Sequence, residues 1–316
     1  SNMSVDTQPD KDVRSMNCEY ESQSKRGIVV WTDSPNFNVN YTIWNGTNWT
    51  MFGVTPKLLA SDFPDQLNLI SNPRKNETIL TANAFDGIVG LIAALVWNGT
   101  SWGNMINFTQ DSGITSTIYR PVDCAYESVS GLARCFYANG TGVIAVRTWD
   151  GITWSEPASA QFAITNLSAN LTLVKAKANP ISNEIMISAT DNGNVTALHW
   201  NGTTIDFQVS TGNQTATTLI REKIDIVYRH FNDNSTSTMA LFVRANTTVR
   251  PLFSIWDGTT FTNRSNPATS AVNLVQHVQL TTYINGQSGT GHWAFLLTDD
   301  NADTIDLQHF NSTAWS

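Results

Sequence analysis

The stretch Trp97-Asn98-Gly99-Thr100-Ser101-Trp102 is one of six copies of a motif in which an aromatic residue is followed by Asn or Asp, usually by Gly, and usually by a second aromatic residue. The copies begin at Trp44, Trp97, Trp149, Trp200, Trp256 and Phe310. Their starting positions are 53, 52, 51, 56 and 54 residues apart. This spacing is close to the roughly 40 to 50 residues of one four-stranded propeller blade, so it indicates one structural unit repeated along the chain.

Each motif has the pattern of a β-hairpin. Apolar and polar residues alternate over residues 143–149, which is the period of two of a pleated strand. Asn-Gly or Asp-Gly then supplies the positive φ angles of a tight turn. In the first copy the pattern predicts four strands, A to D, over residues 13–21, 27–32, 39–44 and 48–54.

A second, longer repeat spans two copies of the motif. Cys18-Glu19-Tyr20-Glu21-Ser22 nearly matches Cys124-Ala125-Tyr126-Glu127-Ser128 at an offset of 106, and Asn72-Pro73 matches Asn179-Pro180 at an offset of 107. The sequence therefore predicts an all-β, six-bladed β-propeller of four-stranded antiparallel blades, built from three tandem two-blade units. We expect one domain over residues 13–316. Residues 1–12 comprise a tag remnant, Ser1-Asn2-Met3, and a segment expected to pair with the last blade and close the ring.

Composition excludes several function classes. With 18 Lys and Arg against 26 Asp and Glu, the net charge is -8, which disfavours nucleic acid as a partner. The longest apolar run, residues 88–97, is half the roughly 20 residues of a membrane-spanning helix, so we expect no membrane insertion. Sequons of the form Asn-x-Ser/Thr, as at Asn40, Asn76 and Asn139, favour an extracellular or cell-surface location.

The three cysteines are Cys18, Cys124 and Cys135. If a hairpin turns at Val129-Ser130, residues whose numbers sum to 259 oppose each other, and 124 plus 135 is 259. We therefore predict that Cys124 and Cys135 are cross-strand neighbours able to form a disulfide, with Cys18 free. The alternative is that both are small buried apolar residues, because free cysteine packs well in cores.

These motifs resemble the Trp-Asn/Asp-Gly-Thr-x-Trp repeat propellers of prokaryotic cell-surface or secreted proteins, most of them of unassigned function. The turn also distantly resembles that of the six-bladed fucose-binding lectins, in which a Glu three positions before the motif Trp helps to hold the sugar. The corresponding residues here are Tyr41, Ala94, Val146, Ala197, Phe253 and Leu307. None is acidic, so the resemblance does not carry the fucose site to this chain.

The loops between strands B and C supply the predicted ligand-binding residues, because loops on that face of a propeller commonly bind. These residues are Asp33, Asn36, Phe37, Asp86, Asp191, Asp299, Asp300 and Asp303. Ordinary turn chemistry is the alternative explanation, since Asp, Asn and Gly tolerate the required dihedral angles.

A second set of candidate residues lies on or beside strand A, the innermost strand of a blade. We expect Glu19, Glu21, Glu127 and Arg229 to line a central channel, near the recurring Tyr20, Tyr126 and Tyr228. The alternative is that these charges are solvated or paired near the turn. For the motif Trp residues, packing between blades is favoured over stacking against sugar rings.

The sequence contains no recognised catalytic motif. The five histidines have no zinc-ligand spacing, and nucleophile elbows, phosphate loops and dinucleotide fingerprints are absent. We therefore predict no catalytic residue, metal or cofactor. The leading hypothesis is a non-catalytic, monomeric extracellular interaction module that binds an unknown protein or glycan through its loops. The alternatives are a glycan-binding lectin that uses aromatic stacking, and a glycoside-active enzyme with acids at the channel mouth.

Overall fold

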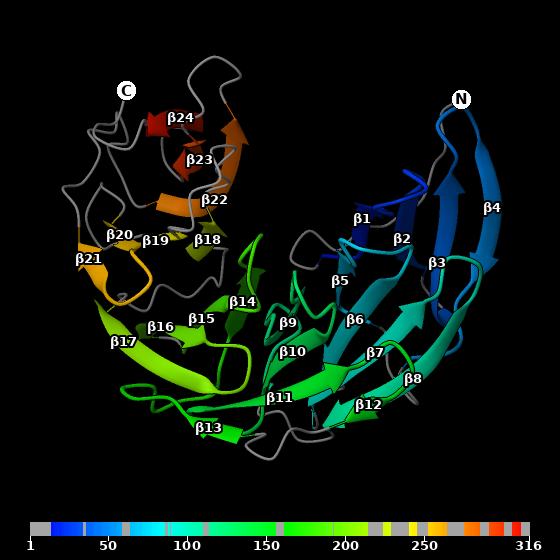
Figure 1. The fold of residues 1–316 in the computed structure, drawn as a ribbon. Coiled ribbons are helices and arrows are strands. Elements are labelled where there is room, and N and C mark those ends of the chain that lie inside the picture. The colour runs from blue at the N-terminus through cyan, green and yellow to red at the C-terminus, as the bar shows by residue number, and fades with distance from the viewer. Residues whose placement is uncertain are drawn as a thin grey trace. The chain divides into compact units, whose positions relative to one another are not determined.

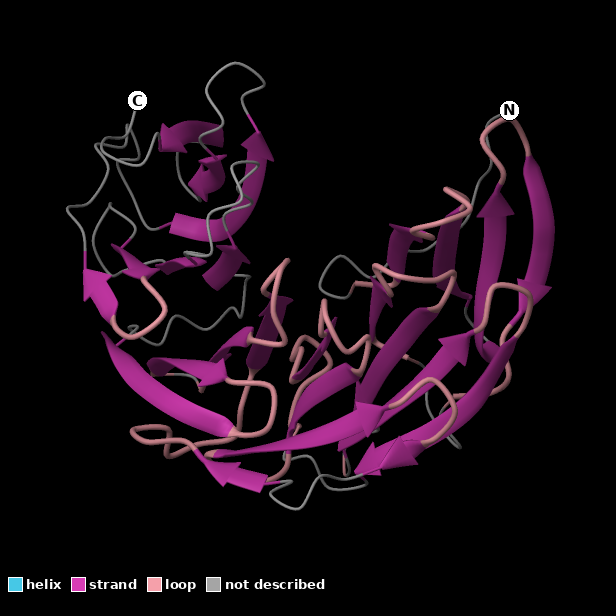
Figure 2. Cartoon of the chain, in the orientation of Figure 1, coloured by secondary structure: helices cyan, strands magenta, loops and turns pink. Residues whose placement is uncertain are grey.

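The computed structural model describes most of the chain, namely residues 14–33, 36–58, 64–85, 88, 90–109, 114–155, 161–191, 193–213, 224–228, 240–244, 252–263, 275–284, 291–299 and 305–310. These residues form strands, turns and loops and include no helix (Figure 2). Accordingly, none of the described residues lies in a helix suited to crossing a membrane. The chain forms two compact units, Ser1–Ile164 with Ser168–Val174, and Thr165–Leu167 with Lys175–Ser316.

The first unit contains three antiparallel sheets, which we call blades 1 to 3. Blade 1 has β1 (Met16–Tyr20), β2 (Gly27–Asp33), β3 (Asn36–Trp44) and β4 (Trp49–Val54). Blade 2 has β5 (Gln66–Ser71), β6 (Thr78–Phe85), β7 (Gly90–Trp97) and β8 (Trp102–Thr109). Blade 3 has β9 (Val122–Tyr126), β10 (Ala133–Ala138), β11 (Val143–Trp149) and β12 (Trp154–Ser155), and β13 (Gln161–Ala163) also pairs with β11. Strand β1 lies beside β5, and β5 beside β9 (Figure 1).

The second unit contains blades 4 to 6. Blade 4 has β14 (Leu173–Ala178), β15 (Ile185–Thr190), β16 (Asn194–Trp200) and β17 (Ile205–Asn213). Blade 5 has β18 (Ile224–Tyr228), β19 (Ala240–Arg244), β20 (Leu252–Trp256) and β21 (Phe261–Asn263). Blade 6 has β22 (Val275–Ile284), β23 (Gly291–Asp299) and β24 (Ile305–Phe310) among its described residues. The first two residues of β14 belong to the first unit.

The predicted propeller fold of four-stranded antiparallel blades is confirmed. In blades 1 to 5 the strands pair in chain order, A with B, B with C and C with D, and the three described strands of blade 6 also pair in chain order. The four strands predicted for the first copy correspond to β1 to β4, with ends that differ by up to three residues where both are described. The expected ring-closing role of residues 5–12 concerns a segment outside the described residues.

The middle strands of the blades form the core. All eight residues of β6 except the last are buried, and so are all six of β10 and all six of β15. Both faces of these strands are covered, which explains why apolar residues predominate on both faces instead of alternating with polar ones. The outer strand β4 is half-buried at Trp49 and Gly53 and exposed at its other residues, so the outer edge of blade 1 carries surface positions.

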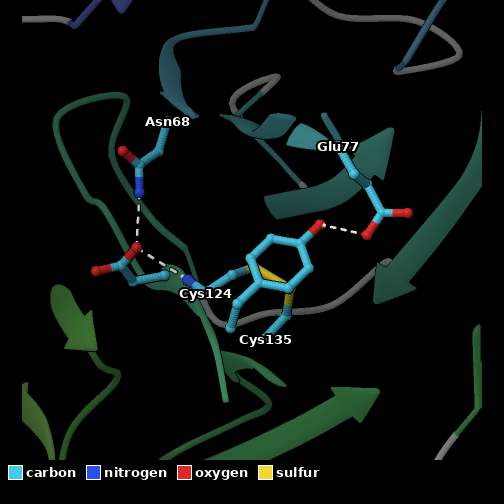
Figure 3. The surroundings of a disulfide bond; sticks show 6 residues. Asn68, Glu77, Cys124 and Cys135 are labelled. Carbon is cyan, nitrogen blue, oxygen red and sulfur yellow. Dashed lines mark hydrogen bonds between the residues drawn. A yellow bond between two sulfur atoms is a disulfide. The ribbon is translucent and has the colours of Figure 1, made fainter. Parts of the chain in front are cut away.

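The structure joins Cys124 and Cys135 by a disulfide (Figure 3). The two residues are register partners on β9 and β10, as the numbering of the hairpin predicts. Cys18 is free and exposed. Its register partner on β2 is Val29, so blade 1 keeps the position of the bond but lacks the second sulfur atom.

Replacing Val29 with Cys is expected to create a second disulfide, to Cys18. The residue separation, 29 minus 18, equals the separation of 11 in the native bond. A closed loop of this size restricts the unfolded chain and should raise the free energy of unfolding by about 2 kcal/mol. Urea denaturation with and without reductant measures the effect, with Val29→Ser as the control. Equal stability of the oxidised and reduced variant would contradict the equivalence of blades 1 and 3.

Candidate functional site

The motif turn is stabilised by its own Asn or Asp. Oδ1 of Asn98 accepts hydrogen bonds from the backbone N–H groups of Thr100 and Ser101, each at 2.9 Å. Gly99 has a φ of 96°, which Gly adopts without the strain of a side chain. In the fifth copy, hydrogen bonds led by the backbone N–H of Thr260 lower the pKa of Asp257 to about 2. Turn formation thus accounts for the polar motif residue.

The first aromatic residue of the motif is buried in copies two to five and half-buried at Trp44 in the first copy. Trp97 and Trp200 are 0% exposed, Trp149 is 1% exposed and Trp256 is 3% exposed. The second aromatic residue is only half-buried at Trp49, Trp102, Trp154 and Phe261. The two rings of a motif pack together, with centroids 5.4 Å apart for Trp97 and Trp102. In copies two to five the first ring therefore belongs to the core. The second ring, where the copy has one, lies at the surface of the same blade.

We call the contact between neighbouring blades a seam. In seam 1–2, the fully buried Glu21 accepts hydrogen bonds from Nε1–H of Trp97 and from Nε–H of Arg26, both at 2.7 Å. Arg26 also donates to the carbonyl oxygen of Gly99 at 2.6 Å. Burial raises the pKa of Glu21, but its hydrogen bonds with Arg26, Ser24 and Trp97 lower the pKa further than burial raises it. The turn residue Glu21 of blade 1 is thus hydrogen-bonded to Trp97 of blade 2.

Seam 2–3 uses a different donor for the same purpose. Glu77, in the A-to-B turn of blade 2, is 5% exposed, and Oη of Tyr126 donates to its Oε1 at 3.1 Å (Figure 3). Asn72 donates to the same oxygen atom at 3.1 Å, and Nζ of Lys75 lies 3.0 Å from Oε2. Burial, followed by the charge of Glu77, raises the pKa of the Tyr126 phenol. Both oxygen atoms of the Glu77 carboxylate therefore have partners, two hydrogen-bond donors at Oε1 and the Lys75 ammonium group at Oε2.

Seam 4–5 contains the equivalent carboxylate, Glu184, with different hydrogen-bond partners. Asn179 and the hydroxyl of Ser182 both donate to Oε2, at 2.7 and 3.1 Å. Oε1 lies 3.9 Å from Nε2 of His199, which is too far for a hydrogen bond. Burial and then the charge of Glu184 raise the pKa of the Tyr228 phenol, yet this hydroxyl has no hydrogen-bond partner.

His199 lies between two carboxylates in this seam. Its Nδ1 is 2.8 Å from Oδ1 of Asp206, while its Nε2 faces Glu184. The imidazole is 4% exposed and packs on the indole of Trp256, with centroids 4.8 Å apart. Neither Nε2 of His199 nor Nε1 of Trp256 has a hydrogen-bond partner. Seam 4–5 therefore combines two partly exposed acids with three buried polar groups that lack partners, counting Tyr228.

The predicted loop residues are only partly visible. Asp191 is 4% exposed, and its Oδ1 accepts the backbone N–H groups of Gly193 and Asn194 at 2.9 and 2.6 Å, which is turn chemistry. Four others lie on strands, but their side chains are not described: Asp33, Asn36, Phe37 and Asp299. The remaining three lie outside the described residues: Asp86, Asp300 and Asp303. The loop site remains a prediction.

The predicted channel residues do not form one group among those described. Glu21 and Glu127 are buried in ion pairs with Arg26 and Arg134. Glu19 is half-buried on β1, and Arg229 lies outside the described residues. Glu21 and Glu127 therefore follow the alternative interpretation, in which these charges are paired near the turn.

A different polar row links the innermost strands of the first unit. Nδ2 of Asn17 donates to Oδ1 of Asn68 at 3.0 Å. Nδ2 of Asn68 donates to Oδ1 of Asp123 at 2.6 Å (Figure 3). Sequence reasoning missed this row. A signal was present, because Asn17 and Asp123 each precede the Cys of the long repeat at the same offset of 106. The row connects β1, β5 and β9.

Solved structures with the same overall fold include sugar-related proteins. A fucose-specific lectin from Aleuria aurantia is 13% identical, with a TM-score of 0.52 over 96% of this chain and 94% of the lectin. AofleA from Arthrobotrys oligospora is 12% identical, with a TM-score of 0.50 over 99% and 94%. An α-L-arabinofuranosidase from Fusarium graminearum is 10% identical, with a TM-score of 0.51 over 95% and 93%. At these identities the likeness shows the fold alone. No family model and no curated protein matches the sequence.

Proposed function

We propose that this protein is a non-catalytic, extracellular propeller that binds glycans at its seams. The observation that carries the proposal is the half-buried second aromatic ring of the motif, at Trp49, Trp102 and Trp154. At Trp102 and Trp154 the ring packs on the buried indole of its own motif and still offers surface to a ligand. The apolar C–H face of a sugar suits an aromatic face of this kind.

Likeness of fold to a fucose-specific lectin supports this class of ligand. The fucose-lectin carboxylate itself has no counterpart at the described positions. Ala94, Val146 and Ala197 are 0% exposed, and Phe253 is 3% exposed. The proposed binding therefore depends on aromatic rings and on polar groups supplied elsewhere in the seams.

A glycoside-active role is less well supported at the acids that the structure describes. Hydrolysis by two carboxylates requires them to flank the scissile bond. In seam 4–5 the imidazole of His199 occupies the space between Glu184 and Asp206. This pair is therefore arranged around a side chain of the protein rather than around a substrate bond.

An extracellular location is supported by the disulfide between Cys124 and Cys135. Disulfides persist in oxidising compartments and are uncommon in the cytosol. The same reasoning favours an encounter with cell-surface or secreted glycans.

Trp102→Ala and Trp154→Ala are expected to weaken glycan binding about tenfold, because each removes a surface that stacks on a sugar ring. A glycan array identifies the ligands, and isothermal titration calorimetry measures the change in Kd. Ile152→Ala is the matched control, since Ile152 is 77% exposed at a motif turn but has no aromatic face. An array without hits, or hits insensitive to both Trp changes, would refute the proposal.

Protein binding is a second candidate function, favoured by the outer edge of blade 1. Phe52 is 61% exposed and Val54 is 54% exposed on β4, an edge strand. Edge strands present unpaired backbone groups that can pair with another chain. Under this alternative, Phe52→Ser would weaken partner binding and leave any glycan binding intact.

A further inference from the structure

The A-to-B turns of blades 1 and 2 lie side by side and carry a group of cations. Oγ–H of Ser22 donates to the carbonyl oxygen of Lys75 at 3.1 Å, and the backbone N–H of Ser24 donates to Oδ1 of Asn76 at 2.9 Å. We call the cations of these two turns the cationic turn patch: Lys25, Arg26, Arg74 and Lys75. All are exposed except Arg26, which is half-buried.

Two cations of this patch are neutralised by buried acids. Nε of Arg26 lies 2.7 Å from Oε2 of Glu21, and Nζ of Lys75 lies 3.0 Å from Oε2 of Glu77. In the part of the chain that the structure describes, the other two cations form no ion pair with a carboxylate. Lys25 and Arg74 are therefore the uncompensated charges of the patch.

The uncompensated cations use backbone carbonyl groups as partners. The ammonium group of Lys25 donates to the carbonyl oxygen of Ser22, and the guanidinium group of Arg74 donates to that of Val129 in the turn of blade 3. A carbonyl group does not neutralise a charge. Since an ammonium group has three N–H donors and a guanidinium group has five, both side chains retain donors for an anion.

The turn of blade 1 does not need a cation at Lys25. In blade 3 the equivalent residue is Gly131, whose backbone N–H donates to the carbonyl oxygen of Glu127 at 2.9 Å, as that of Lys25 does to Glu21 at 3.1 Å. The φ angles are 59° for Lys25 and 75° for Gly131, a region that favours glycine. Blade 1 thus keeps a charged side chain in a strained conformation, and such residues cluster at functional sites.

The turn of blade 2 does not need a cation at Arg74 either. Its backbone N–H donates to Oδ1 of Asn72 at 2.9 Å, and in blade 4 the equivalent N–H of Ile181 donates to Oδ1 of Asn179 at 3.0 Å. The same turn therefore forms with an uncharged residue. Formation of the two turns leaves the uncompensated cations unexplained.

One exposed acid lies in the neighbouring turns of blade 3. Asp150 accepts hydrogen bonds at Oδ1 from the backbone N–H groups of Ile152 and Thr153, both at 2.7 Å. A Cβ atom at Gly151 would lie 2.8 Å from Nζ of Lys75, so Lys75 is the cation beside this acid. The charges of the two uncompensated cations remain available.

The cationic turn patch lies at the same end of the blades as an aromatic ring of the proposed glycan surface. Arg26 donates to the carbonyl oxygen of Gly99 in the motif turn of blade 2 at 2.6 Å. Trp102 follows this turn directly and is the register partner of Trp97. A glycan that stacks on Trp102 is therefore brought to the end of the blade that carries the cations.

We propose that the cationic turn patch binds the carboxylate or sulfate groups of an acidic glycan through Lys25 and Arg74. The guanidinium fork matches a planar carboxylate, and both cations are accessible to a flexible chain. Two uncompensated cations are fewer than the roughly six to ten phosphate contacts of a typical nucleic-acid interface, and the net charge of -8 also disfavours that partner. This inference rests on the proposed function and names the class of glycan.

Isothermal titration calorimetry with acidic oligosaccharides tests this inference. A hexamer of α-1,4-linked D-galacturonic acid presents carboxylates, and a heparin hexasaccharide presents sulfates as well. The methyl-esterified galacturonic acid hexamer is the matched neutral probe, because it keeps the sugar chain without the charges. An acidic probe is expected to bind about tenfold more tightly than the neutral one at about 50 mM NaCl and to lose this advantage at about 300 mM, since salt screens exposed ion pairs.

Two variants use residues that the chain itself places at the equivalent turn positions. Lys25→Gly combined with Arg74→Ile is expected to raise the Kd of the acidic probe about tenfold and to leave that of the neutral probe within about twofold. Lys57→Ala is the control, because it removes an exposed cation beyond β4, at the opposite end of blade 1. If Arg74→Ile lowers the melting temperature, Arg74→Gln replaces it, since Gln has no charge but can still donate to Val129.

Each outcome decides the inference. Absence of binding by both acidic probes, or an equal loss with Lys57→Ala, would overturn it, and so would tighter binding of a single-stranded DNA of equal charge. If neutral glycans bind and depend on Trp102 or Trp154 but not on the cations, the inference fails while the proposed function stands. If acidic probes depend on the cations and on no aromatic ring, the inference stands and the aromatic surface fails. If no glycan binds, both fail.

Discussion

Trp97→Ala is expected to lower the free energy of unfolding by about 4 kcal/mol, the range for truncating a fully buried large aromatic side chain. Trp97 is 0% exposed and packs against Tyr41 of blade 1 and Trp102 of its own blade, with centroids 5.7 and 5.4 Å away. The change removes this packing and a 2.7 Å hydrogen bond to Glu21. Urea denaturation followed by circular dichroism measures the loss.

Trp102→Ala provides the comparison for this prediction. Its ring is only half-buried, so we expect a loss of about 1 to 2 kcal/mol. Equal losses of unfolding free energy for both variants would contradict the difference in burial between the two aromatic positions of the motif. A loss below about 2 kcal/mol for Trp97→Ala would contradict its role in the core.

The hydrogen bond to Glu21 also makes this contribution depend on pH. The folded-state pKa of Glu21 lies below its ordinary value, because its hydrogen bonds outweigh the effect of burial. Its ionised form therefore stabilises the fold above the unfolded pKa of about 4.3, and this stability is lost as the pH falls through the folded pKa. Trp97→Phe removes one of the interactions that lower the pKa, so the stability of this variant should depend less steeply on pH between about 4.3 and the folded pKa.

The motif made the fold predictable from sequence because its chemistry is local. Asn98 specifies a turn by accepting hydrogen bonds from residues two and three positions away, and Gly99 supplies the positive φ angle that the turn needs. Both effects are local to the motif. The pairing of Cys124 with Cys135 was equally accessible, because the register of a hairpin follows from its turn.

The seams were not predictable in the same way. Glu21 contacts Trp97 across 76 residues, and Tyr126 contacts Glu77 across 49. The repeat shows that such residues recur but does not show which of them meet. His199 is one of five histidines without zinc-ligand spacing, and its contacts with Asp206 and Trp256 depend on side-chain placement in two strands and a second blade.

Arg134→Ala is expected to lower the free energy of unfolding by about 3 to 5 kcal/mol, because it leaves the charge of a buried Glu127 without its cation. Glu127 is 1% exposed, and its Oε1 accepts from Nε–H of Arg134 at 2.7 Å. Arg134 is 8% exposed and also donates to the hydroxyl of Thr148 at 2.7 Å. The measurement is urea denaturation at pH 7.

The equivalent pair in blade 1 supplies the matched control. The side chain of Arg26 is 31% exposed, so water can replace it beside Glu21, and Trp97 continues to donate to that carboxylate. Arg26→Ala should therefore cost less than Arg134→Ala. The double change Arg134→Met with Glu127→Gln should recover part of the loss, because it removes the buried charge together with its partner. Equal losses for the two Arg variants, or no recovery in the double variant, would show that the charge of Glu127 is not what makes Arg134 necessary.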